Sequence, residues 1–226
     1  MLYKETVTQE MWELLQRLMK DEKLKEFNLV GGTALSLIIG HRLSIDLDLF
    51  SIKDFDQNAL LSHLSDQHPV KIREIFNNTI LLDIGNVKVD IITHKYPWQE
   101  LIQIEQGIRI ASLTDIGAMK LHAIFQNGTR IKDFVDMYFL LEHNPFRIYL
   151  EAYQNKYGGN PRLVAHALLH HNNIDTEEKV KLLKGKETDF SKMTQRLKKA
   201  VLNTSLTFSE SKNKIPPLNK ARGFRR

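Results

Sequence analysis

The stretch from residue 27 to residue 50 constrains the fold more than any other part of this chain, because it joins a glycine pair to alternating aspartates. A short apolar run, FNLV, leads directly into Gly31 and Gly32. Residues 33–39 then have the composition of a buried helix, and residues 45–50 alternate apolar and polar side chains with the period of a β-strand. This order predicts a strand, a tight turn, a helix and a second strand, as in α/β proteins.

The rest of the chain divides into a part rich in strands and a part made only of helices. Further strands are predicted at residues 70–76, 79–85, 87–93 and 108–112, and helices in the same part at residues 8–20 and 56–67. Beyond these, the pattern predicts helices alone, at residues 114–126, 130–143, 145–157, 161–171, 175–184 and 189–202. We therefore expect an α/β domain over residues 1–110, a helical domain over residues 111–204 and a flexible basic tail over residues 205–226.

Composition narrows the function classes. The chain contains no cysteine, which excludes a disulfide framework, a cysteine zinc site and a cysteine nucleophile. No apolar run approaches the length of a membrane span and the start of the chain lacks the pattern of a secretion signal, so we expect a cytoplasmic protein without a membrane partner.

The net charge of +5 is unevenly distributed along the chain. Residues 192–226 hold ten Lys and Arg against one acid, whereas the remaining residues carry a net charge of −4. A basic end of this kind is compatible with neutralising the phosphates of a nucleic acid, and equally with a solvated, disordered end.

The two aspartates of the second strand point to a cation. Asp46 and Asp48 lie on the same face of a strand, and Asp90 joins them if residues 87–93 pair beside residues 45–50. Neighbouring carboxylates repel one another unless a cation lies among them. Mg²⁺, or Mn²⁺, binds oxygen ligands of this kind, and two such ions about 3.5–4 Å apart suit a phosphoryl displacement.

The glycine pair fits the same chemistry. Gly31 and Gly32 stand at a strand-to-helix turn, where backbone N–H groups and a helix N-terminus can hold phosphate. Thr33 adds a hydroxyl, and His41 with Arg42 adds donors close to the aspartates. A glycine turn followed by paired aspartates and a third acid predicts a site for phosphoryl transfer.

These residues resemble a known family. The segment GGTALSLIIGHRLSIDLDLFS is similar to the signature of the AbiEii-type toxin nucleotidyltransferases, a branch of the DNA polymerase β-like superfamily. The segment SLTDIGAMKLHAIFQNGTRIKDFVDMYFLL resembles the family's second block, and the resemblance covers roughly residues 28–142. It implies a mixed-sheet nucleotidyltransferase domain followed by an all-helical domain, with the active site in the groove between them.

The resemblance also implies roles for the matching residues. Asp46 and Asp48 would bind Mg²⁺ and hold the triphosphate of an NTP, and Asp90 would bind a second metal ion and help activate the acceptor hydroxyl. Lys120 would neutralise nucleotide phosphates. The matching residues of the second block that would assist Lys120 or contact the nucleotide are Arg130, Lys132, Asp133 and Asp136.

The source of the hydroxyl that contacts phosphate remains open between two residues. Gly32 stands where many members of the wider superfamily have Ser, so this hydroxyl would come from Thr33 or Ser44. Without the first block, the charges of residues 130–136 would be interpreted as ion pairs on an exposed helix face. His94 is close enough in sequence to Asp90 to approach the site, whereas the other histidines of the chain, His122 among them, are interpreted as ordinary packed or surface residues.

The reaction implied is Mg²⁺-dependent transfer of a nucleoside monophosphate from an NTP to a hydroxyl acceptor. RNA, in particular the tRNA 3′ end, is the expected acceptor, and the protein would be the toxin of a toxin–antitoxin or phage-defence pair with a cognate antitoxin as partner. Two other hypotheses are a phosphotransferase acting on a small molecule or a protein hydroxyl, and a non-catalytic module that binds a nucleic acid or another partner.

Overall fold

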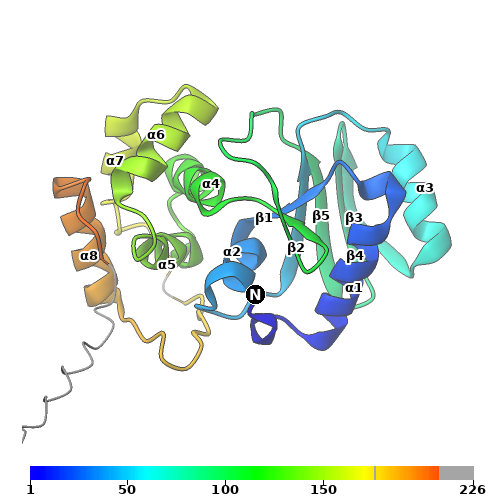
Figure 1. Cartoon of the computed structure of the whole chain (residues 1–226), viewed down its shortest axis with the longest axis horizontal. Helices are drawn as coiled ribbons and strands as arrows, with labels where there is room; N and C mark the ends of the chain where they lie inside the picture. The colour runs from blue at the N-terminus through cyan, green and yellow to red at the C-terminus, as the bar shows by residue number, and fades with distance from the viewer. Residues whose placement is uncertain (176, 209–226) are drawn as a thin grey trace, which may run out of the picture.

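A single mixed β-sheet organises the first half of the molecule (Figure 1). The computed structural model describes residues 1–175 and 177–208. The seven strands have the order β3-β4-β5-β2-β1-β7-β6, with β2 parallel to β5 and β1 parallel to β7 and the other neighbours antiparallel. They are β1 (Asn28–Val30), β2 (Asp46–Ser51), β3 (Val70–Phe76), β4 (Thr79–Ile84), β5 (Val87–Thr93), β6 (Gln103–Glu105) and β7 (Ile108–Ile110).

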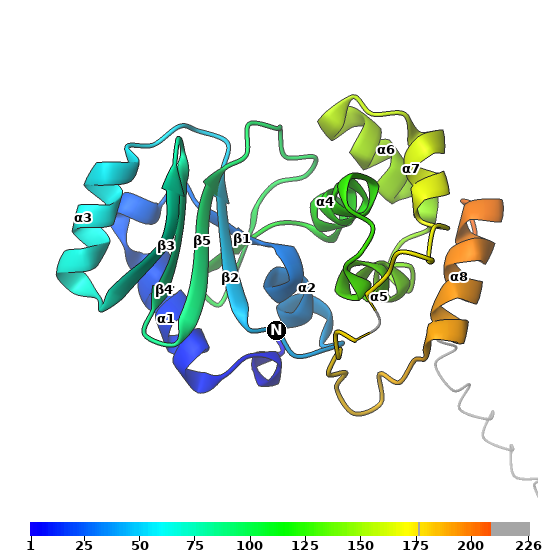
Figure 2. The ribbon, with the colours of Figure 1, turned by 180° about the vertical axis from the view of Figure 1, so that it is seen from behind.

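Helices cover the sheet according to where their apolar side chains lie. Helix α1 (Gln9–Lys20) begins where the Thr8 side chain accepts a hydrogen bond from the Met11 backbone N–H, and it buries a stripe of apolar side chains. Helix α3 (Gln57–Gln67) is capped by Asp56 and packs near β3 and β4. Helix α2 (Gly31–Ile39) lies between the sheet and the helical half, as both ribbon views show (Figures 1 and 2).

The second half of the described chain is helical and packs around α4 (Leu113–Gln126). Its other helices are α5 (Ile131–Leu140), α6 (Phe146–Tyr157), α7 (Pro161–Ala167) and α8 (Phe190–Leu202). Helix α4 contacts α5, α6 and α7 on one side and α2 on the other. The fold class predicted from the sequence, a mixed α/β part followed by helices, is confirmed.

The buried Asp115 ties the two halves together at one point. Its carboxylate accepts hydrogen bonds from the backbone N–H groups of Gln99 and Glu100, and it pairs with Lys156 of α6 at 3.0 Å. The loop after β5 is therefore fixed to α4 and α6, which places the end of β5 beside the helical half.

The structure corrects two of the expected helices. Residues 175 and 177–184, the described part of the helix predicted at residues 175–184, are not helical, and the helix predicted at 161–171 ends at Ala167. Strand β6 was not predicted and forms a hairpin with β7. Residues 209–226, most of the predicted basic tail, lie outside the described residues.

The segment predicted as the fifth helix of that half returns to the first half instead. Residues 177–188, called the crossing segment below, are not helical, and Leu182 forms a β-bridge with Arg42 in the loop between α2 and β2. The Leu43 N–H donates to the Lys181 carbonyl at 2.8 Å, and the Leu183 N–H donates to the His41 carbonyl at 3.0 Å. These pairings explain why a helix does not form there, since the backbone groups are already bonded to a distant loop.

None of the helices in residues 1–175 and 177–208 combines the length and the apolar character that crossing a membrane requires.

Candidate active site

The three aspartates predicted to act together lie on two neighbouring parallel strands. Asp48 of β2 is the direct register partner of Asp90 of β5, so the expected pairing of residues 87–93 beside residues 45–50 is confirmed. Asp46 and Asp48 point to one face of the sheet, while Leu47 and Leu49 are buried on the other. Ile45, the first residue of the strand predicted at residues 45–50, lies before β2 and is 63% exposed.

The glycine pair allows the backbone to approach the charged groups closely. Gly31 has a φ of +70°, in the left-handed region, and a Cβ atom at this position would collide with the Asp48 carboxylate. A Cβ atom on Gly32 would collide with the Arg42 guanidinium. Val30 gives α2 no side-chain cap, so the first backbone N–H groups of this helix, beside Asp48, are available to an anion.

Burial perturbs Asp48 strongly. Burial, followed by the negative charges of Asp46 and Asp90, raises the pKa of the Asp48 carboxyl to about 7. In the described part of the chain, neither Asp46 nor Asp48 has a Lys, Arg or His side chain within ion-pair distance. A divalent cation bound to these oxygens would remove the repulsion, so the two carboxylates fit a magnesium or manganese ion.

Asp90 differs from the other two acids because a cation already holds it. Arg73 of β3 donates from Nη2 to Asp90 Oδ1, and its Nε lies 3.2 Å from Asp83 Oδ1. Within the described residues, no three His, Asp or Glu side chains are grouped closely enough to form a ready metal site. Asp90 would join Asp46 and Asp48 around a metal ion through an oxygen that Arg73 does not hold.

A buried network of charges faces the aspartates from the helical half. Lys120 Nζ of α4 lies 2.7 Å from both Asp133 Oδ1 and Asp136 Oδ2 of α5. Arg42 donates from Nε and Nη2 to the two oxygens of Asp136, at 2.6 and 2.9 Å. Burial alone would raise the pKa of Asp136, but Arg42 and Lys120 hold it well below its usual range.

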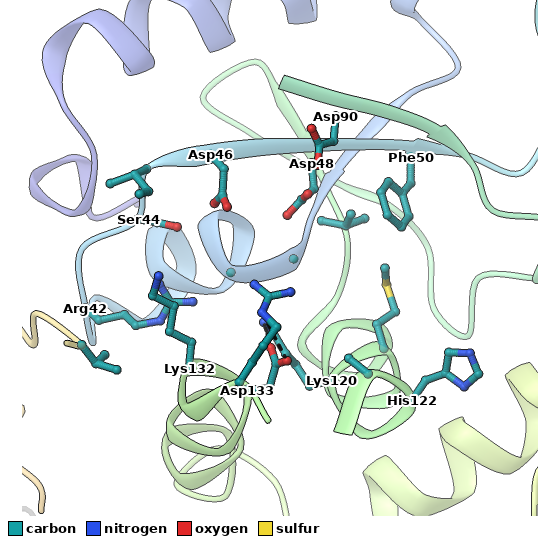
Figure 3. Close-up of a pocket in the computed structure, with 18 of the residues that line it drawn as sticks. Arg42, Ser44, Asp46, Asp48, Phe50, Asp90, Lys120, His122, Lys132 and Asp133 are labelled. Carbon is teal, nitrogen blue, oxygen red and sulfur yellow. Dashed lines mark hydrogen bonds and ion pairs between the residues drawn. The ribbon is translucent and has the colours of Figure 1, made fainter. Parts of the chain in front are cut away.

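This network excludes the alternative in which residues 130–136 form ion pairs on an exposed helix face. Asp133 and Asp136 are buried, and only Arg130, 4.0 Å from Asp133, is largely exposed. Lys120 is 7% exposed and reaches the cavity from below the aspartates, where Figure 3 shows it beside Asp133. A lysine held in this way keeps its charge, since the two carboxylates outweigh the effect of burial and raise its pKa.

Three residues expected to contact the nucleotide lie behind the wall of the cavity. His41 is fully buried, and its Nε2 contacts Asp136 Oδ1 at 2.8 Å. The Thr33 hydroxyl bonds to the Ser44 hydroxyl at 2.8 Å and also donates to the Asp46 carbonyl. None of the three residues His41, Thr33 and Asp136 is among the lining residues. The structure therefore places them behind the lining, where His41 Nε2, the Thr33 hydroxyl and the Asp136 carboxylate are bonded to other protein groups.

The cavity between the sheet and the helical half has a volume of about 760 Å³. It is lined by the remaining predicted residues, which are Gly31, Gly32, Arg42, Ser44, Asp46, Asp48, Asp90, Lys120, Arg130, Lys132 and Asp133. Figure 3 shows Asp46, Asp48 and Asp90 on the sheet side and Lys120, Lys132 and Asp133 on the helical side. The sequence thus identified most of the charged lining.

Two groups of lining residues were not predicted. The crossing segment contributes Lys179, Val180 and Lys181, which no pattern in the sequence could bring to the site. Helix α4 contributes Met119, His122, Ala123 and Gln126. Their spacing of three, four and seven positions from Met119 places them on one helix face, a signal that the sequence carries although His122 by itself is interpreted as an ordinary packed or surface residue. His94 approaches the site as expected, and Phe50 and Tyr157 lie with it.

The chain is similar to a known family and to several known proteins. The family model "Nucleotidyl transferase AbiEii toxin, Type IV TA system" matches residues 13–211. A curated relative, "Uncharacterized protein aq_aa25" of Aquifex aeolicus (strain VF5), is 32% identical over 133 residues. That match covers 57% of this chain and 64% of the relative, so the chain spans less than two thirds of that protein's length.

Two solved structures share the fold. JHP933 from Helicobacter pylori has a TM-score of 0.53 and 19% identity, with 89% of this chain and 92% of that chain covered. A proposed nucleotidyltransferase from H. pylori has a TM-score of 0.51 and 19% identity, with coverage of 85% and 90%. At this identity the two structures establish the fold, while the family model covers most of the chain, both predicted blocks and the crossing segment. The chain therefore belongs to the AbiEii family of nucleotidyl transferase toxins.

Proposed function

We propose that this protein moves a nucleoside monophosphate from an NTP to a hydroxyl of RNA, with Mg²⁺ as its metal ion and the tRNA 3′ end as the acceptor. The observation that carries the proposal is the pair Asp46 and Asp48, unpaired among the described residues, facing Lys120 across the cavity. Carboxylates opposite a lysine suit a substrate that brings both a cation and phosphates.

In the proposed reaction, the aspartates bind the metal ions, and Lys120 with the N-terminus of α2 binds the phosphates. Asp46, Asp48 and Asp90 would hold one or two magnesium ions, which neutralise charge on the reacting phosphate and on the leaving pyrophosphate. The N-terminus of α2 and Lys120 would hold the phosphates in place. A bond forms between the acceptor oxygen and the α-phosphorus, the bond from that phosphorus to the bridging oxygen breaks, and pyrophosphate leaves.

Asp90 is the acid best placed to act at the acceptor hydroxyl. It lies on the strand beside Asp48, and Arg73 holds one of its two oxygens. The other oxygen would accept the hydroxyl proton or bind the metal ion that makes the hydroxyl more acidic. Arg73 thereby acts as a positioning residue for Asp90.

Two observations support RNA as the acceptor. The last 35 residues are strongly basic, and Arg130, Lys179 and Lys181 add cations to the lining of the cavity. The name of the matching family includes a type IV toxin–antitoxin system, so we also propose a cognate antitoxin as partner and a cytoplasmic location. We also propose that the α/β domain ends at residue 110 and that the helical domain ends at residue 204.

The first experiment is nucleotide transfer by the purified full chain. Each NTP labelled with ³²P at the α-phosphate is incubated with Mg²⁺ and total bacterial RNA, beside Asp48→Asn and the exposed control Asp66→Asn. We expect label in an RNA band with the wild type and Asp66→Asn, and none with Asp48→Asn. Parallel reactions with the γ-phosphate labelled test the phosphotransferase hypothesis: label transferred from that position alone would contradict nucleotidyl transfer.

A shortened chain tests the acceptor separately. Removing residues 209–226 deletes six basic residues and one acid and leaves every described element in place. We expect RNA labelling to fall while Mg²⁺-dependent NTP binding is retained, because the tail would contribute phosphate contacts to the acceptor. Unchanged labelling of RNA would contradict a role of the tail, and no labelling of RNA by either chain would contradict the RNA acceptor.

A further inference from the structure

The cavity is chemically polarised from one end to the other. Figure 3 shows Arg42, Ser44 and Lys132 at one side, Asp48 in the middle, and Phe50 with His122 at the other side. The cationic crossing-segment residues belong to the same lining. A ligand that fills the cavity must therefore be charged in one part and uncharged in another.

The uncharged side is built from four different elements. We call it the aromatic compartment, and its residues are Phe50 of β2, His94 after β5, Met119, His122 and Ala123 of α4, and Tyr157 of α6. The His122 ring stacks on the Tyr157 ring, with centroids 4.0 Å apart and planes 5° apart. The Phe50 and His94 rings lie 5.4 Å apart, and His94 Nε2 lies 3.0 Å from the Tyr157 hydroxyl.

The two histidines of this compartment are neutral near pH 7. Burial, together with the positive charge of Lys156, lowers the pKa of His94 to about 4. Burial also lowers the pKa of His122. A compartment without positive charge offers nothing to a phosphate, which would lose its hydration there without compensation. Flat apolar groups suit it instead.

One polar atom in the compartment lacks a partner. His122 Nδ1 is buried and makes no hydrogen bond among the described residues. Because this nitrogen is shielded from the cavity, His122 meets a ligand through the rest of its ring. The ligand that fits has a flat aromatic face.

We propose that the aromatic compartment holds the nucleobase of the NTP, with the face of the base against the aromatic side chains. This inference rests on the proposed function. Within an NTP the base and the outer phosphates lie on opposite sides of the α-phosphate. If the α-phosphate lies at Asp46 and Asp48, the outer phosphates extend toward Arg42 and Lys132, and the base extends toward Phe50 and His122 (Figure 3).

The test compares an NTP with inorganic tripolyphosphate, which has the charged part of the ligand and no base. Calorimetric titration of the full chain in Mg²⁺ gives a Kd for each of the four NTPs and for tripolyphosphate. The variants are His122→Ala and His122→Phe, and the matched control is His68→Phe, a histidine after α3 that does not line the cavity. Circular dichroism confirms that each variant is folded.

We expect His122→Ala to weaken binding of the preferred NTP about tenfold or more, because base stacking contributes on this scale, and to leave tripolyphosphate unchanged. His122→Phe keeps a ring against Tyr157, so it should retain most of the NTP affinity that His122→Ala loses. His68→Phe should behave as the wild type.

Two results would overturn the inference. If His122→Ala weakens tripolyphosphate as much as the NTP, the residue supports the phosphate site and no base lies beside it. If NTP binding is unchanged and the KM for RNA rises, the compartment takes a base of the acceptor. A wild type that binds neither NTP nor tripolyphosphate would instead contradict the proposed function itself.

Discussion

In the metal-free protein, the surroundings of Asp48 disfavour the ionised form of its carboxyl group. Its pKa in the folded chain is about 7, above the ordinary value of 3.8, because of burial and the neighbouring acids. A carboxyl group with a raised pKa stabilises the fold fully below its unfolded pKa, and that contribution is lost as the pH rises through the folded value. The metal-free protein should therefore lose stability between about pH 4 and about pH 7, by at most about 4 kcal/mol from this residue.

Replacing Asp48 by a neutral side chain should remove this loss of stability. We expect Asp48→Asn, in EDTA at about pH 8, to increase the free energy of unfolding by about 2–4 kcal/mol relative to the wild type, because the amide does not ionise. Urea unfolding at several pH values provides the measurement. The wild type and the variant should have equal stability below about pH 4, and parallel curves over the whole range would contradict a raised pKa of Asp48.

The glycine at position 31 offers a second test at the scale of a residue. Gly31→Ala adds a Cβ atom at a φ of +70° and pushes it against the Asp48 carboxylate, so we expect nucleotidyl transfer to fall about tenfold or more. Gly107→Ala is the matched control, because its φ is +80° and no atom lies near the added Cβ. Equal losses of activity in the two variants would indicate backbone strain alone.

Among the elements, the sequence predicted the strands that have a clear alternation of side chains or a long apolar run. The alternation of residues 45–50 predicted the common face of Asp46 and Asp48, and the long apolar runs predicted β4, β5 and their order along the chain. The short β6 carries no strong pattern, which is why its hairpin with β7 was missed. The network around Asp136 joins residues 94 positions apart, and spacing within one helix cannot reveal such a contact.

The crossing segment likewise reaches the cavity from a distant part of the sequence, and its lysines can be tested. Lys179 and Lys181 line the cavity and have no ion-pair partner among the described residues, unlike Lys132, which pairs with Glu178 at 2.6 Å. Replacing both lysines by Ala should raise the KM for NTP or RNA about 5–10-fold, and the effect should shrink at about 0.5 M salt, because exposed charges are screened. Steady-state kinetics at two salt concentrations give the comparison.

A control variant with the same change in net charge shows whether the effect depends on the position of the lysines at the cavity. Lys198 and Lys199 lie on α8, outside the lining of the cavity. Replacing both by Ala should change neither KM by more than about twofold, if the loss at residues 179 and 181 reflects their position at the cavity. Equal effects in the two double variants would indicate a general response to net charge.

At the scale of the whole molecule, the substrate should bridge the two halves. Asp48 belongs to the sheet and Lys120 to α4, so a Mg²⁺–NTP bound as we propose would contact both. At a concentration of 100 times its Kd, such a ligand stabilises the folded state by about 2.7 kcal/mol. For a chain of this length, Tm should rise by about 5–10 °C.

Thermal unfolding with and without Mg²⁺–NTP measures this shift. We expect it to be nearly absent in Asp46→Asn combined with Asp48→Asn, because the variant lacks the carboxylates that face the metal ion, and to be retained in the exposed control Asp66→Asn. A shift that persists in the double variant would show that the ligand binds elsewhere.

The crossing segment also sets how short an active version of this protein can be. Both blocks of the family signature end by residue 142, yet one wall of the cavity is supplied by residues 179–181, and the loop that carries His41 and Arg42 pairs with residues 181–183. A fragment cut after the second block would keep every signature acid and lose that wall. The shortest catalytic unit is therefore longer than the motif by which it is recognised, and a search by motif alone would set its boundary too early.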